Sequence, residues 1–290
     1  MYPAQFEYYR AATLNDVQRL LKEHPDAKLL AGGHSLLPLM KLRLARPGAV
    51  VDIGRVTKLK GITVQGETLH IGALTTHAEL AASRDVRRAA PVLTEAAALV
   101  GDPAVRNRGT IGGNVAHADP ASDLPTVLVA AGAQFVAVGP TGERTIDATD
   151  FFQGLMATAL GEHEILTAVT VPVMKDSEGA AYVKFVHPAS RYAVVGAAVV
   201  IATRDGACSS ARIAVGGLVP RATRAKSVEA ALAGQPLSPE SIEKAAREIA
   251  RDLGDDVLGD IFASAEFRRA MVPVYLGRAI ATAARRSGQA

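Results

Sequence analysis

The chain has 290 residues, enough for two domains of ordinary size. Its hydrophobic fraction of 49% contains no apolar run of about 18 residues, and the first residues lack the basic-then-apolar pattern of a signal peptide. We therefore expect a cytoplasmic protein without a membrane span. The net charge of +3 comes from interspersed charges, and with no Trp and 4% aromatic residues the composition argues against nucleic acid as a partner.

Cysteine usage limits the metal chemistry that this chain can supply. Cys208 is its single cysteine. An internal disulfide, a cysteine zinc site and an iron–sulfur cluster held by this chain alone are therefore excluded. We expect no metal site in it.

Residues 1 to about 173 predict short strands and helices in alternation, which is typical of an α+β domain. Capping residues and apolar spacing mark the helices, and β-branched residues between turns mark the strands. The predicted helices cover residues 15–23, 35–41, a segment opened by the capping box of Thr76 and Glu79, 91–100 and 124–131. The predicted strands cover residues 28–30, 49–53, 68–72, 134–138 and 144–146, the last two as a hairpin.

The polar, turn-rich residues 175–179 predict a domain boundary, which divides the chain into residues 1–175 and 176–290. Strands are predicted at 181–186, 193–203 and 211–216. Helices follow at 240–253 and from 266 towards 286, the second kinked or reset near Pro273. Strands followed by helices favour a sheet with helices on one face.

Two glycine-centred segments carry the strongest functional signal. They are Ala-Gly-Gly-His-Ser at 31–35 and Gly-Thr-Ile-Gly-Gly-Asn at 109–114. Paired glycines beside hydroxyl or amide side chains allow a backbone to close on a phosphate with its N–H groups unobstructed. Neither segment is a Rossmann fingerprint or a P-loop, so the pair indicates a nucleotide held by another architecture. An ordinary turn is the alternative for either segment alone.

These segments, together with the sequence around them, resemble the FAD-binding medium subunits of the molybdenum hydroxylases, and most of all the aerobic carbon monoxide dehydrogenase group. The resemblance covers nearly the whole chain. Its motifs lie at residues 31–41, 105–114, 119–125, 150–154, 164–167 and 267–271.

The resemblance implies an α+β fold: an FAD-binding domain of the vanillyl-alcohol-oxidase (PCMH) type with two subdomains, then a flavoprotein C-terminal domain with a three-stranded antiparallel sheet and helices. It also implies one non-covalent FAD. The residues that it assigns to cofactor binding are Ala31, Gly32, Gly33, His34, Ser35, Thr110, Ile111, Gly112, Gly113, Asn114, Asp123, Leu166, Lys184 and Tyr192.

The family's use of both segments on the FAD pyrophosphate agrees with their chemistry. Backbone N–H groups of residues 32–35 and 110–114 are expected to donate to phosphate oxygens, with the hydroxyls of Ser35 and Thr110 as further donors. Asp123 is expected to accept from a ribose hydroxyl, with helix capping as the alternative. Lys41 is a phosphate partner or a solvated lysine.

Three further side chains have roles by resemblance and an ordinary alternative. His34 could bond covalently to the flavin in the wider fold, whereas this family holds its cofactor without a bond. Tyr192 falls where the related subunit has a tyrosine beside the isoalloxazine ring, and could equally be an ordinary strand tyrosine. Lys184 could set the electric field near the flavin, or be a solvated strand lysine.

No catalytic side-chain set is recognisable, so we expect no catalytic residue and assign the chemistry to the flavin. The resemblance implies an electron-transfer subunit that takes electrons from an iron–sulfur small subunit beside a molybdopterin large subunit, in a dimer of heterotrimers, and passes them to an external acceptor. The alternatives are a stand-alone FAD-dependent oxidase, a flavin subunit of a purine, aldehyde or N-heterocycle hydroxylase, and a scaffold without cofactor.

Overall fold

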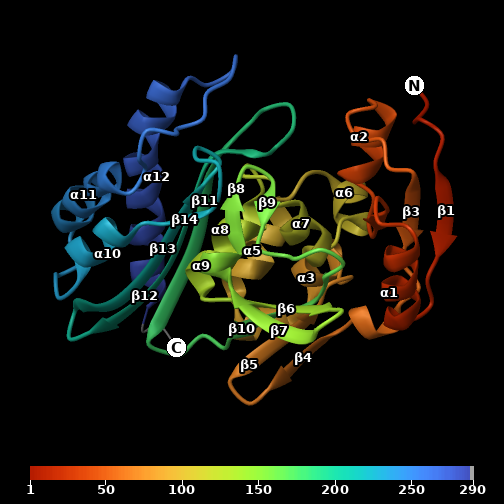
Figure 1. The fold of residues 1–290 in the computed structure, drawn as a ribbon. Coiled ribbons are helices and arrows are strands. Elements are labelled where there is room, and N and C mark those ends of the chain that lie inside the picture. Colours follow the sequence, from red (N-terminus) through yellow and green to blue (C-terminus); the bar gives the residue numbers. More distant parts are fainter. Residues whose placement is uncertain (288–290) are drawn as a thin grey trace.

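Three larger sheets follow one another along the chain in the computed structural model, which describes residues 1–287 (Figure 1). In this view the first sheet lies at the right, the second in the middle with helices packed over it, and the third at the left. The alternation of strands and helices confirms the predicted α+β class. Within these residues, no helix combines the length and the apolar character needed to cross a membrane.

The first sheet is small and parallel. Its order is β1-β3-β2, from β1 (Glu7–Arg10), β3 (Ala49–Asp52) and β2 (Lys28–Leu30). Helix α1 (Leu14–Glu23) is capped by Thr13, whose side chain forms a capping box with Asp16, and it buries Val17, Leu20 and Leu21. β1 was not predicted because most of its residues are exposed and show no apolar alternation.

The second sheet is antiparallel and has five strands, in the order β4-β5-β10-β6-β7. Helix α8 (Asp123–Ala131) lies in the core and is buried at every position, which fits its nearly continuous apolar sequence. The strands are β4 (Ile62–Gln65), β5 (Thr68–Gly72), β6 (Gln134–Gly139), β7 (Gly142–Asp147) and β10 (Ile165–Pro172), and β8 (Phe152–Gly154) pairs separately with β9 (Ala157–Thr158). The helices of this part are α2 (Leu36–Lys41), η1 (Thr57–Leu59), α3 (His77–Ala82), α4 (Arg84–Ala89), α5 (Pro91–Leu99), α6 (Pro103–Arg108), α7 (Ile111–His117) and α9 (Ala148–Phe151).

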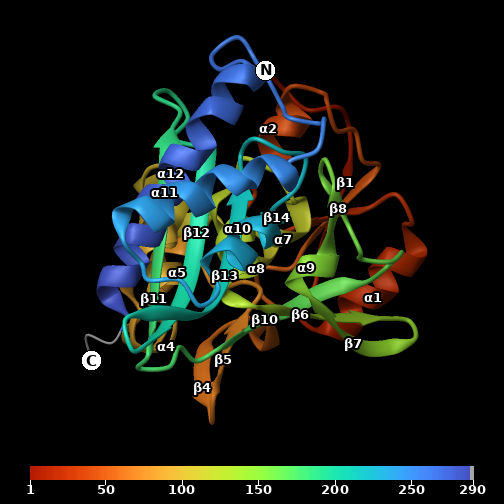
Figure 2. The same ribbon diagram turned by 90° about the vertical axis from the view of Figure 1, so that its left-hand side faces the viewer.

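The third sheet is covered on both faces. Figure 2 shows α10 (Lys226–Leu232), α11 (Pro239–Arg247) and α12 (Ala265–Arg286) in front of β11 (Glu178–Val186), β12 (Ala193–Arg204) and β13 (Ala207–Gly216). Ala198 and Val200 face the core around α5 and α8, whereas Val199 and Ile201 face α12. β12 therefore has no polar face, which explains its unbroken apolar sequence.

The structure adds to the prediction for this half and corrects it in two places. The three predicted strands are confirmed, and a two-residue strand, β14 (Thr223–Arg224), joins β13. The helix predicted over 240–253 ends at Arg247 and continues as the 3₁₀ turn η2 (Glu248–Arg251). α12 was predicted to be kinked or reset near Pro273; it continues through this residue as one helix packed on β11 and β12, so the reset was wrong, and the kink stays a prediction.

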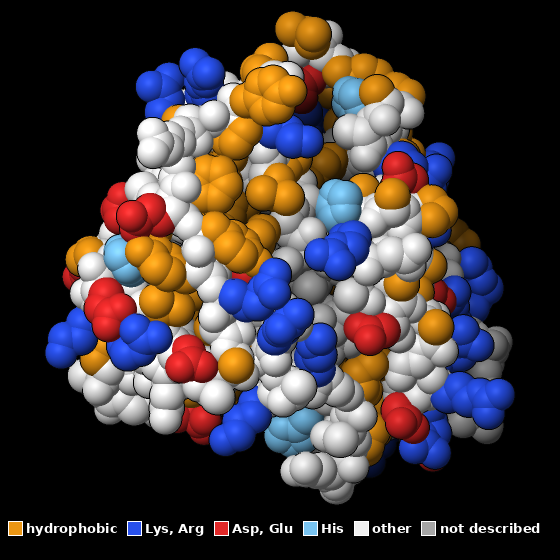
Figure 3. Space-filling model, turned by 90° about the vertical axis from the view of Figure 1, so that its right-hand side faces the viewer, with side chains coloured by type: hydrophobic (Ala, Val, Ile, Leu, Met, Phe, Trp, Pro, Cys, Tyr) orange, Lys and Arg blue, Asp and Glu red, His pale blue; other side chains and the backbone are white. Residues whose placement is uncertain are grey.

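Surface charges are mixed on the face that carries the N-terminal sheet. In Figure 3, Lys and Arg side chains form a group near the middle of this face, with Asp and Glu on either side and hydrophobic side chains gathered above. This face has no wide area of a single sign, as expected from the interspersed charges of the sequence.

Arg268 at the start of α12 is the buried charge that fixes this helix to the third sheet. Its guanidinium donates to the carbonyls of Val194 and Gly217 at 2.8 and 2.6 Å and to Asp260 at 2.6 Å, and its side chain is 6% exposed. Replacement would leave the carbonyls of Val194 and Gly217 without this donor.

We predict that Arg268→Met lowers the free energy of unfolding by about 2–4 kcal/mol, because the carbonyls of Val194 and Gly217 lose their buried donor and the half-exposed Asp260 loses its partner. Urea denaturation followed by circular dichroism measures this change. Arg285→Met, an exposed change on the same helix, is the control and should cost less than about 0.5 kcal/mol. Equal losses in the two variants would contradict the role of Arg268.

Candidate functional site

A cavity of about 580 Å³ lies between the N-terminal sheet, the helices that follow it and the loop before β12. Both glycine segments line it, although they are separated by about 75 residues in sequence. Twelve of the predicted site residues share this cavity: Ala31, Gly32, Gly33, His34, Ser35, Thr110, Gly112, Gly113, Asn114, Asp123, Leu166 and Tyr192.

The first glycine segment presents free backbone donors. It connects β2 to α2, and Gly33 adopts a left-handed φ of 79°, which favours glycine. Among the hydrogen bonds of residues 1–287, none uses the N–H groups of residues 32–35. This turn can therefore donate to an anion placed in the cavity, as the sequence predicted.

The second glycine segment differs from the prediction because it is the first turn of α7, capped by Thr110, rather than an open loop. The N–H groups of Ile111 and Gly112 donate to the carbonyls of Thr75 and Ala73. Those of Gly113 and Asn114 donate to Thr110. The expectation that the N–H groups of residues 111–114 are free for phosphate was therefore wrong, since the segment at 73–75 and the start of the helix already use them.

Gly32, Gly112 and Gly113 have different reasons to lack a side chain. A Cβ on Gly112 would overlap Ala73, and a Cβ on Gly32 would overlap the carbonyl of Arg108 just before this segment. A Cβ on Gly113 would lie 2.8 Å from Thr110 Oγ1, and its next neighbour would be Ala31 at 3.8 Å. Gly112 therefore lets the chain segments approach, whereas Gly113 keeps the cavity open.

Asp123 lies at the cavity wall in a buried ion pair. Its Oδ2 accepts from Lys184 Nζ at 2.8 Å and its Oδ1 accepts from the Tyr182 hydroxyl at 2.6 Å, with side-chain exposures of 5% for Asp123 and 1% for Lys184. Burial raises the pKa of Tyr182 well above its usual value, which keeps the phenol protonated as the donor. Both oxygens of Asp123 are thus engaged within the chain.

The structure corrects the alternatives for these residues. The cap of α8 is Ser122 rather than Asp123, which is the first helical residue. Lys184 is not solvated, and it lies behind Asp123 rather than on the cavity lining. Ile111 also lies outside the lining, fully buried in the core.

The remaining predicted side chains lie near the rim. His34 is exposed beside the free N–H groups. Tyr192 lines the cavity, is 42% exposed and lies in the loop just before β12, so it is not a strand tyrosine. Lys41 is exposed and does not line the cavity.

Sequence reasoning missed His77, which lines the cavity as the first residue of α3. Its Nδ1 is buried without a hydrogen-bond partner, as is Oδ1 of Asn114, whose Nδ2 donates to Ser122 at 3.0 Å. The capping box of Thr76 fixed the start of α3, but nothing in the sequence placed the next side chain beside the glycine segments.

Family models match both parts of this chain. The FAD binding domain in molybdopterin dehydrogenase matches residues 4–174, and the CO dehydrogenase flavoprotein C-terminal domain matches residues 180–283. The chain belongs to this family of FAD-binding subunits. The predicted family, fold class and FAD cofactor are thereby confirmed.

Similar proteins of this family align over nearly their whole length. The carbon monoxide dehydrogenase medium chain of Hydrogenophaga pseudoflava is 39% identical, with 97% of each chain covered. The nicotine 6-hydroxylase medium subunit of Paenarthrobacter nicotinovorans is 37% identical, with 97% of this chain and 98% of that one covered. Quinoline 2-oxidoreductase from Pseudomonas putida 86 superimposes with a TM-score of 0.94 at 32% identity, covering 99% of this chain and 100% of the other.

The described residues fit a flavin nucleotide. The cavity has the volume of a small-molecule site, about 300–1,000 Å³, and one wall carries free N–H groups suited to a pyrophosphate. Nδ1 of His77 and Oδ1 of Asn114 are buried beside the cavity without hydrogen-bond partners, so both are available to polar atoms of a bound cofactor.

The buried imidazole of His77 makes the free energy of unfolding depend on pH. Burial, with a smaller contribution from His34, lowers the pKa of His77 from 6.5 to about 4. Between pH 6.5 and about pH 4 the imidazole is therefore protonated in the unfolded chain but not in the folded chain. The free energy of unfolding falls as the pH drops through this range.

We predict that His77 accounts for about 2 kcal/mol of the loss in unfolding free energy between pH 7.5 and pH 5. His77→Gln should lose that much less over the same range, because it has no imidazole to protonate. Urea denaturation of the flavin-free chain at both pH values measures the difference. The exposed change His34→Gln should reduce the wild-type slope only slightly, because His34 makes the smaller contribution to the lowered pKa of His77. A wild-type slope in His77→Gln would refute the assignment.

Proposed function

We propose that this chain is the FAD-binding electron-transfer subunit of a molybdenum hydroxylase complex similar to aerobic carbon monoxide dehydrogenase. The observation that carries the proposal is the row of unused N–H groups at residues 32–35, facing a cavity that the second glycine segment completes. It occurs in a chain whose family model is an FAD-binding domain.

The proposed cofactor contacts follow the cavity wall. Residues 32–35 hold the pyrophosphate through backbone N–H groups and the Ser35 hydroxyl, and Ala31 lies beside them. Thr110, Gly112, Gly113 and Asn114 form the opposite wall, which Ile111 supports from the core. Leu166 and Tyr192 supply apolar and aromatic surface for the remainder of the cofactor, and Asp123 with Lys184 lies beyond them.

Bound FAD would supply the conversion between one-electron and two-electron transfer. The chain's own residues bind the cofactor, orient it and exclude water from its buried end. They include no catalytic side-chain set. The one cysteine, Cys208, is buried, and its burial raises the pKa of its thiol, so it is suited to packing rather than cluster ligation.

The relatives are named medium chains and subunits, and the family is one of multi-subunit molybdenum hydroxylases. We infer an iron–sulfur small subunit and a molybdopterin large subunit as partners, in a cytoplasmic dimer of heterotrimers with an external electron acceptor. Medium chains of enzymes named for carbon monoxide and for nicotine are 39% and 37% identical to this one, so the substrate is a property of another subunit. The subunit names of these relatives disfavour a stand-alone oxidase.

The domain boundary is proposed at residues 175–176. It is supported by the gap between the two family-model matches, which end at 174 and begin at 180, and by the exposed Lys175, Asp176 and Ser177 between β10 and β11.

We predict that the purified full chain carries one FAD, all of which acid precipitation releases to the supernatant, because His34 makes no covalent bond to it. The isolated chain should not oxidise carbon monoxide, purines or aldehydes, and electron transfer should return when cluster and molybdenum subunits are added. Absorbance of the supernatant and dye-reduction assays are the measurements. Colour that stays with the precipitate would favour the covalent alternative, and substrate oxidation by the chain alone would favour the oxidase.

We predict that Gly113→Val abolishes FAD retention in a folded chain, because Gly113 lines the cavity and the added side chain would crowd Thr110 Oγ1 on that wall. Gly112→Val, its neighbour, should instead lower the melting temperature of the flavin-free chain, because the added atoms overlap Ala73. Flavin content after gel filtration and thermal melting separate the two effects. A Gly113→Val chain with full flavin occupancy would remove the second segment from the site.

A further inference from the structure

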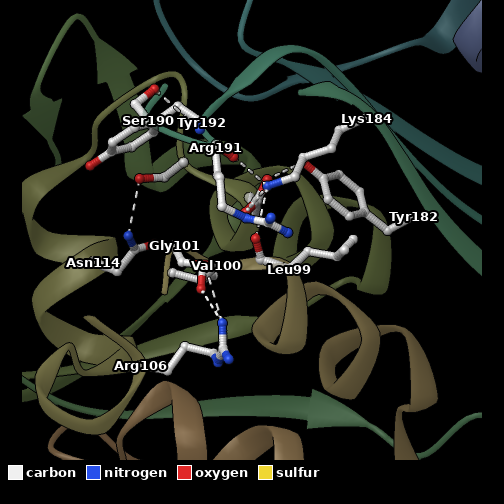
Figure 4. A network of polar contacts seen from close by, with 12 residues as sticks. Leu99, Val100, Gly101, Arg106, Asn114, Tyr182, Lys184, Ser190, Arg191 and Tyr192 are labelled. Atoms are coloured by element: carbon white, nitrogen blue, oxygen red, sulfur yellow. Dashed lines mark hydrogen bonds and ion pairs between the residues drawn. The ribbon is translucent and has the colours of Figure 1, made fainter. Parts of the chain in front are cut away.

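Lys184 joins three chain segments that are distant in sequence. Its Nζ donates to Asp123 Oδ2 at 2.8 Å, to the carbonyl of Arg191 at 2.7 Å and to the carbonyl of Leu99 at 3.2 Å. Figure 4 shows the ammonium group at the centre of these contacts. An ammonium has three protons, so each of the three can serve one acceptor.

Each of the three segments forms part of the cavity wall. Leu99 ends α5, and the next two residues, 100 and 101, line the cavity. Asp123 begins α8 and lines it together with Ser122. The Arg191 carbonyl belongs to the loop that carries Tyr192 to the rim. Lys184 itself lies outside the lining, so it contacts the walls from behind.

The loop segment depends on this bond more than the two helix ends do. Arg191 has a φ of 61°, a left-handed conformation that side chains rarely adopt. Its carbonyl accepts no other hydrogen bond among the described residues. Within the loop, His187 N–H donates to the Tyr192 carbonyl at 2.9 Å and Arg191 N–H to the His187 carbonyl at 2.8 Å. At its two ends the His187 ring lies 4.6 Å from that of Phe262, and Ala193 N–H donates to the Ala121 carbonyl at 3.1 Å.

We propose that Lys184 is a positioning residue: from β11 of the C-terminal domain it fastens the three walls of the FAD cavity, so this domain controls how tightly the N-terminal domain retains FAD. The inference rests on the proposed FAD site. This role differs from a direct contact between Lys184 and the flavin, because Lys184 holds the cavity walls in place before any cofactor binds.

Tyr182 provides a matched comparison within the same network. It lies two residues earlier on β11 and donates to the other oxygen of Asp123, but it reaches neither Leu99 nor Arg191. Removing the Tyr182 hydroxyl deletes one hydrogen bond to Asp123 and leaves the three bonds of Lys184 in place.

The experiment compares Lys184→Met, Tyr182→Phe and the exposed change Lys175→Met in the full chain. FAD titration by fluorescence, at a temperature where every flavin-free variant is folded, should give a Kd about 10- to 100-fold above wild type for Lys184→Met, the effect of losing charge-assisted hydrogen bonds. The other two variants should stay within about 3-fold. Hydrogen exchange of the flavin-free chain should accelerate at residues 187–193 in Lys184→Met alone.

The outcomes separate the possible roles. A weaker Kd with wild-type exchange at 187–193 would mean a direct contact and overturn positioning, and an unchanged Kd with a lower melting temperature would leave Lys184 a stabilising residue only. Should Lys184→Met fail to fold because Asp123 is left unpaired, Asp123→Asn is compared with Asp123→Asn/Lys184→Met, in which no charge is stranded; the double change should bind FAD about 10-fold more weakly. A wild-type chain that binds no FAD would refute the proposed function itself.

Discussion

The cavity depends on a close backbone approach between two segments that the sequence separates. Gly32 packs against the carbonyl of Arg108, where any side chain would overlap backbone atoms. This contact brings the turn after β2 against the start of α7, so that the free N–H groups of one segment face the capped helix of the other. The remainder of the site is built around this approach: Gly112 brings α7 against Ala73, and Gly113 leaves the space between the segments open.

A second constraint joins the two parts of the chain. The third sheet buries one face against α5 and α8 and the other against α12, so its central strand β12 can carry no polar face. Lys184 and Asp123 are charged residues within this apolar boundary. A buried ion pair of this kind contributes little net stability, because desolvation offsets most of the attraction, but it fixes the relative position of its partners. Here the partners are the end of α5, the start of α8 and the loop at 187–192, which are the places where the cavity wall passes from one domain to the other.

The elements that follow local rules could be predicted from the sequence. The capping box at Thr76, the hairpin of β6 and β7 and the long C-terminal helix all depend on neighbouring residues, and the structure contains each of them. The grouping of the two glycine segments in one cavity was also predicted, because their composition suits a single ligand.

The sequence could not show which backbone N–H groups are already hydrogen-bonded within the fold. The N–H groups of Ile111 and Gly112 are used by the segment at 73–75, which is a contact of the tertiary fold. Lys184 was misplaced for the same reason: a lysine between apolar strand residues has the pattern of an exposed side chain, and it is the tertiary contacts with α5, α8 and the loop at 187–192 that enclose it.

These constraints also explain why one fold can accompany enzymes for different substrates. The cavity is formed from glycines, backbone donors and a few polar side chains, all of which are suited to a constant cofactor rather than to a variable substrate. Relatives named for carbon monoxide and nicotine share nearly the whole length of this chain, and the quinoline enzyme shares its fold. A subunit that only binds and orients a flavin needs to keep its cofactor walls and the face presented to its partners. Its core has to preserve the close approach at Gly32 and the buried pair behind it.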